Sequence, residues 1–206
     1  MTLNKLYGGI MNKFNDYETI ELLTNRLKLM KGKEKDFLKV YEFDFSKLSD
    51  VDNVFTFSKS DNDKIKKCFK KGSKSYYKTC EKAHMFDWIM FLEDEAIGNI
   101  LTTNENEEDK TICVEFNVHP NYWNKGYVTE AMVEVINYLF KIGYDNIRCS
   151  YVDGNEKAKR VLNKLGFKPF GIDKDSYKSI KGNLFDIYNL NLDKEDWLSR
   201  TSKIKL

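Results

Sequence analysis

The alternation of apolar and polar residues is most regular in residues 111–118. Ile112, Val114, Phe116 and Val118 are separated by more polar side chains. A period of two residues predicts a strand with one buried face. Shorter or less regular runs of this kind predict further strands at 22–30, 87–92, 96–101, 146–152 and 183–192. The polar turn at 93–95 would make the second and third of these a hairpin.

Helical spacing begins soon after the strand at 111–118. The apolar residues Val128, Ala131, Met132, Val135, Ile136 and Leu139 lie on one face of a helix, and Gly143 stands where a C-cap is expected. Ala158, Val161, Leu162 and Leu165 predict a second amphipathic helix, with Asn155 near its start and Gly166 just beyond its end. Residues 34–77 predict one or two more helices, and residues 104–110 a charged loop.

Strand-like and helix-like stretches therefore alternate, which predicts a mixed α and β fold. The length of 206 residues suits one domain of ordinary size. Residues 1–16 are polar and glycine-containing, so we expect a flexible N-terminal segment. A single domain is expected over 17–206.

The charges of the chain nearly cancel, with 34 Lys and Arg against 32 Asp and Glu. A net charge of +2 creates no field that would attract nucleic acid. The lysine-rich segment 64–78 is interpreted as the solvated face of a helix. No run approaches the roughly 20 apolar residues of a membrane span, and no signal-peptide pattern is present. We expect a cytoplasmic protein without membrane contact.

The cysteines favour neither a metal site nor a disulfide framework. Cys68, Cys80, Cys113 and Cys149 have no C-x-x-C spacing, and the chain has only two histidines. Reduced thiols and no bound metal are the expectation.

The segment 119–131 joins the strand at 111–118 directly to the strong helix. The first amides of a helix lack intrahelical partners and carry partial positive charge, so an anion is the natural occupant of such a turn. Gly126 would allow a close approach of ligand to backbone, while Thr129 adds a hydroxyl and Lys125 a charge. The segment has neither the Gly-Lys-Ser/Thr triplet of nucleotide-triphosphate loops nor the three glycines of the dinucleotide fingerprint. An ordinary strand-to-helix turn is the alternative that these residues leave open.

The pattern Trp123-x-x-Gly126-x-Val128 resembles the cofactor loop of the GCN5-related N-acetyltransferase superfamily, Gln/Arg-x-x-Gly-x-Gly/Ala. It is most similar to the branch typified by ribosomal-protein N-terminal acetyltransferases, in which tryptophan often comes first. Asn124 and Val128 depart from the glycine or small residue usual at their positions. The resemblance extends in order over about 170 residues and includes Thr24-Asn-Arg26-Leu27, the segment 88–100 with Ile97-Gly98, the segment 155–167 ending Lys164-Leu-Gly-Phe167, and Asp186, Tyr188 and Trp197.

This resemblance implies an α+β fold: a mixed, mostly antiparallel twisted sheet flanked by helices, with two parallel strands that splay at the coenzyme A site. It also implies that acetyl-CoA is the cosubstrate. Backbone pairing with pantetheine would fall to Val118, with Asn117 close by, and Asn155 would bond to the pantetheine arm. From the residues alone, Asn155 is equally well explained as a helix cap. Arg160 or Lys157 would lie near the adenosine phosphates, and the pyrophosphate would be held by the amides of Asn124, Lys125, Gly126, Tyr127, Val128 and Thr129.

The catalytic residues are less clearly marked. Glu115, on the strand entering the site, is the candidate general base, and a solvent-facing carboxylate is the alternative. The tyrosine that serves as general acid in other branches is replaced by Leu162, and the serine that commonly follows the helix-start asparagine by Ala158. Tyr151, Ser150 and Cys149 lie on the next strand and could take these roles, and nothing in the sequence ranks them. Tyr151 is a candidate acid. His119 is interpreted as a surface residue, and an acyl-carrier role for Cys113 or Cys149 is disfavoured.

The expected function is transfer of acetyl from acetyl-CoA to a primary amine by direct attack, with protein N-terminal α-amines favoured. Aminoglycosides, polyamines and amino sugars are alternative acceptors, and succinyl or propionyl an alternative acyl group. A non-catalytic coenzyme A-binding or sensing module is the alternative from another class. The expected assembly is a monomer or a homodimer.

Overall fold

The computed structural model describes residues 19–40, 42–43, 48–49, 51–52, 86–106, 108–179 and 181–201. Its elements in chain order are β1 (Leu22–Leu23), β2 (Leu27–Met30), α1 (Glu34–Val40), β3 (Asp87–Leu92), β4 (Glu95–Asn106), β5 (Thr111–Val118), the 3₁₀ turn η3 (Pro120–Tyr122), α4 (Tyr127–Ile142), β6 (Asn146–Val152), α5 (Glu156–Leu165), β7 (Lys168–Lys178), β8 (Leu184–Asp193) and α6 (Lys194–Thr201). The expected segment 1–16, most of the helical region 34–77 and the lysine-rich segment 64–78 lie outside these residues.

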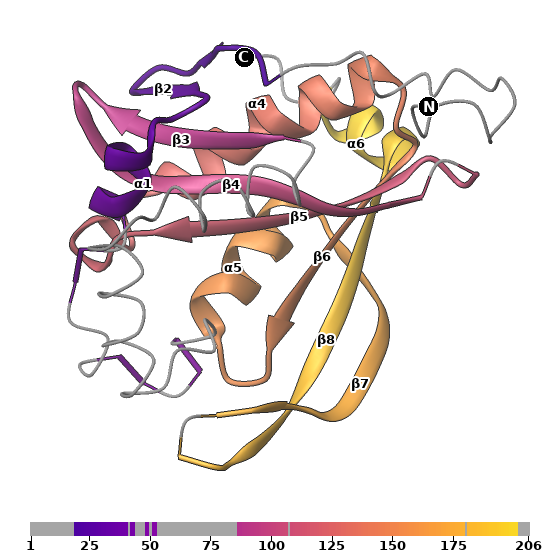
Figure 1. The fold of residues 1–206 in the computed structure, drawn as a ribbon. Coiled ribbons are helices and arrows are strands. Elements are labelled where there is room, and N and C mark those ends of the chain that lie inside the picture. Colours follow the sequence, from indigo (N-terminus) through magenta and orange to yellow (C-terminus); the bar gives the residue numbers. More distant parts are fainter. Residues whose placement is uncertain are drawn as a thin grey trace, which may run out of the picture.

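The described strands form one sheet in the order β1-β2-β3-β4-β5-β6-β8-β7. Neighbouring strands run antiparallel except for β5 and β6, which are parallel. In Figure 1 α4 lies behind the sheet and α1 in front of it, while β6, β8 and β7 turn away from the first five strands. The mixed, mostly antiparallel sheet with helices on both faces confirms the expected fold class.

The core lies between the sheet and α4. The helix buries its predicted apolar face from Ala131 to Leu139, and Val128 is only partly buried at its first turn. Gly143 ends the helix at a φ of 119°, a left-handed conformation that glycine adopts without a Cβ penalty. The strong helix predicted from spacing is therefore confirmed.

Two boundaries expected from the sequence were wrong, and two elements were missed. The single strand expected at 22–30 is broken into β1 and β2 by a turn at Thr24, whose amide donates to the Leu27 carbonyl at 2.9 Å. The expected loop at 104–110 is shorter, because β4 continues to Asn106. β7 and α6 were not predicted: ten of the eleven β7 residues are at least partly exposed, so no apolar alternation marks this edge strand.

Candidate active site

Strands β5 and β6 are paired only at their beginnings. Parallel pairing joins Thr111 to Asn146 and Cys113 to Arg148, and the described residues that follow on the two strands, 114–118 and 149–152, are not paired with each other. The amide of His119 donates to the Ile97 carbonyl at 2.8 Å, so in the alternation of the antiparallel ladder residues 117 and 119 turn their backbone groups toward β4. The backbone groups of Phe116 and Val118 consequently face the gap between β5 and β6. The two strands therefore open into a V with an unpaired backbone edge (Figure 1).

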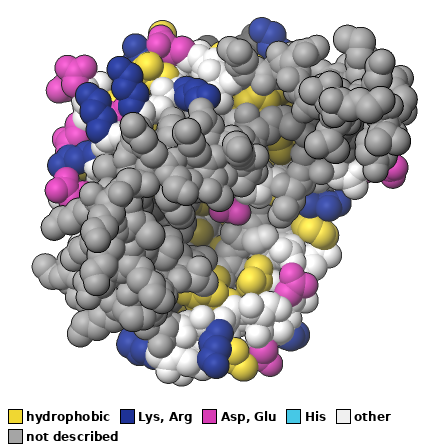
Figure 2. All heavy atoms as spheres, in the orientation of Figure 1, with side chains coloured by type: hydrophobic (Ala, Val, Ile, Leu, Met, Phe, Trp, Pro, Cys, Tyr) yellow, Lys and Arg dark blue, Asp and Glu magenta, His cyan; other side chains and the backbone are white. Residues whose placement is uncertain are grey.

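A cavity of about 880 Å³ occupies this gap. β5, the following turn, the start of α4, β6 and α5 all contribute to its walls. In the space-filling view, hydrophobic side chains lie in a hollow over the region of β6 to β8, with charged side chains around its rim (Figure 2). Of the twelve residues expected to act in the site, only Lys125 does not line the cavity; those that do are Glu115, Asn117, Val118, Asn124, Gly126, Tyr127, Val128, Thr129, Tyr151, Asn155 and Arg160.

The two strands present different faces to the cavity. Ile112 is paired with Ile147, so Cys149 and Tyr151 lie on the α4 side of the sheet, within the main core. Cys113 is paired with Arg148, which places Glu115 and Ser150 on the opposite side. The predicted base and the predicted acid therefore lie on opposite faces of the sheet.

The turn between β5 and α4 is built to leave amides unpaired. Asn124 has a φ of 60° and Gly126 a φ of 81°, both in the left-handed region. Asparagine tolerates that region better than other non-glycine residues, which accounts for its presence where the related loops have glycine. The first α-helical bond runs from the Glu130 amide to the Gly126 carbonyl at 3.0 Å, and no side chain caps the helix. The amides of Tyr127, Val128 and Thr129 thus have no intrahelical acceptor, which suits an anion.

Trp123 connects this turn back to β5. Its indole Nε1 donates to the Val118 carbonyl oxygen at 2.7 Å. One of the two Val118 backbone groups that face the gap is therefore engaged, and its amide is the group left for pairing with a ligand. The tryptophan that distinguishes this loop from the Gln/Arg pattern thus braces the loop against the strand.

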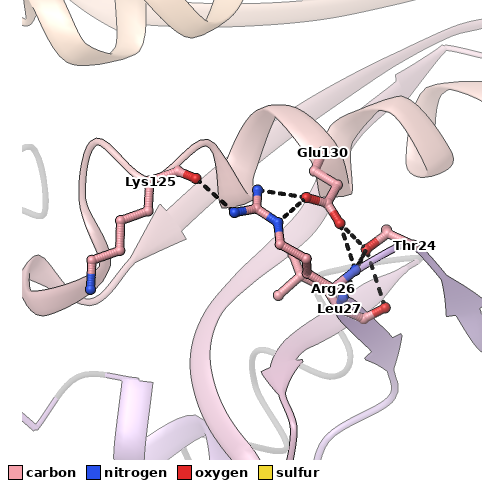
Figure 3. Close-up of polar contacts among 5 residues, drawn as sticks. All are labelled: Thr24, Arg26, Leu27, Lys125 and Glu130. Atoms are coloured by element: carbon pink, nitrogen blue, oxygen red, sulfur yellow. Dashed lines mark hydrogen bonds and ion pairs between the residues drawn. The ribbon is translucent and has the colours of Figure 1, made fainter.

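Residues Thr24 and Arg26 clamp the first turn of α4 through Glu130 (Figure 3). Glu130 Oε1 accepts from Thr24 Oγ1 at 2.5 Å and from the Arg26 amide at 2.9 Å. Glu130 Oε2 accepts from Arg26 Nε at 2.7 Å and forms an ion pair with Nη2 at 2.6 Å. Arg26 also donates from Nη1 to the Lys125 carbonyl at 3.1 Å, so the clamp reaches the turn itself.

The clamp shifts the acidity of its carboxylate. Partial burial raises the pKa of Glu130, but the hydrogen bonds from Thr24 and Arg26 outweigh burial and leave the pKa below its ordinary value. The Arg26 guanidinium also lies 4.5 Å from the centre of the Tyr127 ring. This group ties the first strands to the loop and was recognised in the sequence only as part of a resemblance, not as a contact.

Helix α5 brings Asn155 and Lys157 to the cavity, both already engaged. Asn155 is the N-cap: its Oδ1 accepts from the Ala158 amide at 3.0 Å, and its Nδ2 donates to the Val51 carbonyl at 3.1 Å. Lys157 Nζ contacts the Asp52 carboxylate at 2.8 and 2.9 Å and lies 4.6 Å from the centre of the Trp123 ring. Arg160, one turn further along, is exposed at the cavity wall.

Burial weakens the acidity of three groups beside the gap. It raises the pKa of the Cys149 thiol to about 12 and also raises the pKa of Cys113, so neither favours the thiolate that an acyl carrier needs. Burial raises the pKa of Tyr151 as well, so its hydroxyl stays protonated at neutral pH. The Tyr151 ring stacks on Tyr188 with centroids 5.2 Å apart.

His119 does not line the main cavity. Its Nδ1 accepts from the Asn121 amide at 3.2 Å and caps η3, while Nε2 lies 3.3 Å from the Glu42 carbonyl oxygen. Within the described part of the chain, no cluster of three or more His, Cys, Asp or Glu side chains is placed to hold a metal ion. No helix among the described residues has the length and hydropathy needed to cross a membrane.

Two curated relatives resemble the chain over different lengths. It is 28% identical over 117 residues to the uncharacterized N-acetyltransferase p20 of Bacillus licheniformis, which covers 56% of this chain and 65% of that protein, just under two thirds of its length. It is 28% identical over 183 residues to the uncharacterized N-acetyltransferase YnaD of Bacillus subtilis, covering 86% of this chain and 99% of that protein.

Solved structures share the fold at low identity. The ribosomal-protein-S5-alanine acetyltransferase of Vibrio fischeri aligns with a TM-score of 0.60 at 18% identity, over 86% of this chain and 98% of that one. The microcin C7 self-immunity acetyltransferase MccE, solved in complex with acetyl-CoA and AMP, aligns with a TM-score of 0.64 at 13% identity, over 82% and 93%. The family model of the acetyltransferase (GNAT) domain matches residues 26–168, which run from the clamp arginine through the diverging strands and α5 to the first residue of β7. The chain therefore belongs to the GNAT family of N-acetyltransferases.

Proposed function

We propose that this protein transfers the acetyl group of acetyl-CoA to a primary amine, and that protein N-terminal α-amines are its preferred acceptors. The observation that carries the proposal is the V between β5 and β6, which joins an unpaired strand edge to the unpaired amides at the start of α4. GNAT enzymes use acetyl-CoA, and MccE was solved with it bound.

The residues of the cavity fit that cosubstrate. The amides of Tyr127, Val128 and Thr129 would hold the pyrophosphate, and the amide of Val118 would pair with the pantetheine arm. Gly126, which has no Cβ, would let the ligand approach the backbone of the loop closely. Arg160 supplies a positive charge at the cavity wall. Asn155 would reach pantetheine only by sharing or exchanging its bond to Val51, and Lys157 would reach a phosphate only by leaving Asp52.

Acetyl-CoA supplies an activated thioester that a neutral amine attacks directly. Glu115, exposed on β5 and lining the cavity, would accept the proton that the amine must lose, directly or through water. Tyr151 would donate a proton from the other face of the sheet, where its hydroxyl remains protonated. An α-amine of pKa near 8 costs about 1.4 kcal/mol to deprotonate at pH 7, and a lysine near 10.4 about 4.6 kcal/mol.

That difference favours an N-terminal acceptor, because a single exposed carboxylate is a modest base. The sequence resemblance to the N-terminal branch points the same way. The cavity wall formed by α5 carries Lys157, Arg160 and Lys164. Positive charge there disfavours polycations such as polyamines, which stay the alternative acceptors together with aminoglycosides and amino sugars.

Ligand-dependent unfolding tests the cosubstrate first. The protein is heated with acetyl-CoA, succinyl-CoA, ATP or NADH, all at one concentration that is about a hundred times the dissociation constant for acetyl-CoA. Selective binding of acetyl-CoA adds about 2.7 kcal/mol, a shift on the order of 5–10 °C for a chain of this size. No shift with either thioester would overturn the proposal.

The acceptor is then assigned by release of free thiol from acetyl-CoA. The panel has four acceptors. Two are peptides: one has a free N-terminal alanine, and the other is the same peptide with a blocked N-terminus and an internal lysine. The other two are spermidine and an aminoglycoside. We expect the free α-amine to be acetylated fastest. Faster acetylation of spermidine or the aminoglycoside would move the assignment to small amines.

A further inference from the structure

Three polar side chains form a chain of hydrogen bonds across strands β6, β8 and β7. Ser150 Oγ lies 2.7 Å from Asn189 Oδ1, and Asn189 Nδ2 lies 2.8 Å from Asp173 Oδ2. Ser150 lines the main cavity, whereas Asn189 and Asp173 stand behind it. This series of hydrogen bonds therefore runs from the edge of the β7–β8 hairpin to the gap between the diverging strands.

The direction of these bonds follows from their last member. An ionised carboxylate only accepts hydrogen bonds, so Asp173 requires the NH₂ group of Asn189 to face it. The Asn189 carbonyl must then face Ser150, and because a carbonyl oxygen only accepts, the Ser150 hydroxyl must donate to it. The proton of Ser150 is thus turned away from the cavity, and its oxygen lone pairs are left to accept a bond from a ligand.

Ser150 and Glu115 flank the gap from the same face of the sheet. The parallel register that pairs Cys113 with Arg148 would place Glu115 opposite Ser150 if the strands had stayed together. The strands diverge instead, so the two side chains lie on either side of the opening. One face of the cavity therefore offers two hydrogen-bond acceptors, a carboxylate and an oriented hydroxyl oxygen.

We propose that Ser150 binds the acceptor amine, and that Asn189 and Asp173 are positioning residues that hold its oxygen as an acceptor. This inference rests on the acetyltransferase function proposed above and names the class of amine that the site accepts. A neutral primary amine has two N–H bonds. One would be directed at Glu115, which takes the proton, and the other would be held by Ser150. A secondary amine has a single N–H in its neutral form and leaves one of the two acceptors unpaired, which costs binding. The site is selective for primary over N-methylated amines.

The test uses the acceptor turned over fastest in the panel above and its N-methylated counterpart. Ser150→Ala is expected to raise KM for the primary amine about tenfold, the effect of one hydrogen bond of moderate strength. It should also narrow the preference for the primary over the N-methylated amine by a similar factor, because the variant has lost the acceptor that only the primary amine satisfies. The thermal shift produced by acetyl-CoA should be unchanged, which separates the effect from misfolding.

A control variant accompanies Ser150→Ala, and a second test variant, Asn189→Ala, has a control of its own. Ser176→Ala removes an exposed serine hydroxyl on β7, bonded to the Lys174 carbonyl and outside the cavity lining, and should leave KM unchanged. Asn189→Ala frees the Ser150 hydroxyl to rotate and should raise KM about threefold, whereas Asn191→Ala, two residues further along β8 and outside the cavity lining, should not.

A parent-like KM and unchanged selectivity in Ser150→Ala, alongside an active parent enzyme, would overturn the role of Ser150 and leave the acetyltransferase function standing. Absence of turnover by the parent with every amine would overturn both.

Discussion

The two walls of the cavity are built in different ways. The wall formed by β5, the turn and α4 is braced locally: Trp123 bonds to Val118 five residues earlier, and Gly126 and Asn124 set the turn by their own conformations. The wall formed by β6 to β8 is assembled from distant residues, since Ser150, Asn189 and Asp173 meet only through strand register. The first wall presents backbone donors, which suit a phosphate-bearing cosubstrate shared by a whole family. The second presents side chains, which suit an acceptor that differs from one protein to the next.

The largest effect is expected from a variant that lowers turnover and leaves acetyl-CoA binding intact. Glu115→Gln should lower turnover by about 10²-fold, the usual effect of losing a general base, and most strongly at low pH, where more of the amine is protonated. The acetyl-CoA thermal shift should stay as in the parent, because the amides that would bind the phosphates are untouched. A rate equal to the parent's across pH would remove Glu115 from the mechanism.

A substitution in the loop itself should instead weaken acetyl-CoA binding. Gly126 has a φ of 81°, and Gly126→Val forces a β-branched residue into that conformation at a cost of about 1–2 kcal/mol of stability. Acetyl-CoA affinity should fall at least tenfold, measured by titration calorimetry, because the added side chain stands at the mouth of the loop. Gly182→Val is the matched control, because Gly182 has a φ of 89° and lies in open space on the β7–β8 hairpin. This variant should lose a similar amount of stability and keep the parent's affinity for acetyl-CoA. Equal affinity in Gly126→Val and Gly182→Val would contradict the loop assignment.

The clamp gives the loop wall a pH-dependent contribution to stability. Because the pKa of Glu130 is lower in the folded protein than in the unfolded chain, its contribution to stability is present above the ordinary glutamate range and is lost as pH falls through the lowered value. Glu130→Gln should cost about 1 kcal/mol at pH 7, a modest figure because Arg26 is well exposed.

Urea unfolding at pH 7 and at successively lower pH measures this effect. The difference between parent and Glu130→Gln should shrink as the pH falls below the ordinary glutamate range. Glu134→Gln, on the same helix outside the clamp, serves as the control. A difference that stays constant down to acid pH would show that the carboxylate charge is not what stabilises the clamp.

The smallest effect is expected at Tyr151. A thiol of pKa near 8.5 leaves readily as thiolate near neutral pH, so a general acid has little to contribute. Tyr151→Phe should therefore reduce kcat by less than tenfold while preserving the ring stack with Tyr188. A loss of a hundredfold or more would make Tyr151 indispensable as an acid.

Much of the loop wall was predictable because its information is contiguous. The alternation in 111–118 and the helical spacing after Val128 locate the strand and the helix, and Gly126 marks the turn between them. The helix caps Gly143, Asn155 and Gly166 were also identified, since capping depends on residues a few positions apart. Asn155 proved to be the helix cap, and its part in binding stays a prediction.

The sequence by itself determined the order of strands and helices around residues 87–167, the position of the turn that we propose binds an anion, and the family of the protein. Tertiary structure alone decided where β5 and β6 part, that Arg26 and Glu130 meet across the start of α4, and that Glu115 and Ser150 share a face while Tyr151 lies on the other. It also decided the pairing of β7, whose exposed residues carry no periodic signal. The physical reason is the same in each case: spacing along a chain reports which side of its own element a residue takes, but hydrogen bonds between strands determine which residues of other elements it faces.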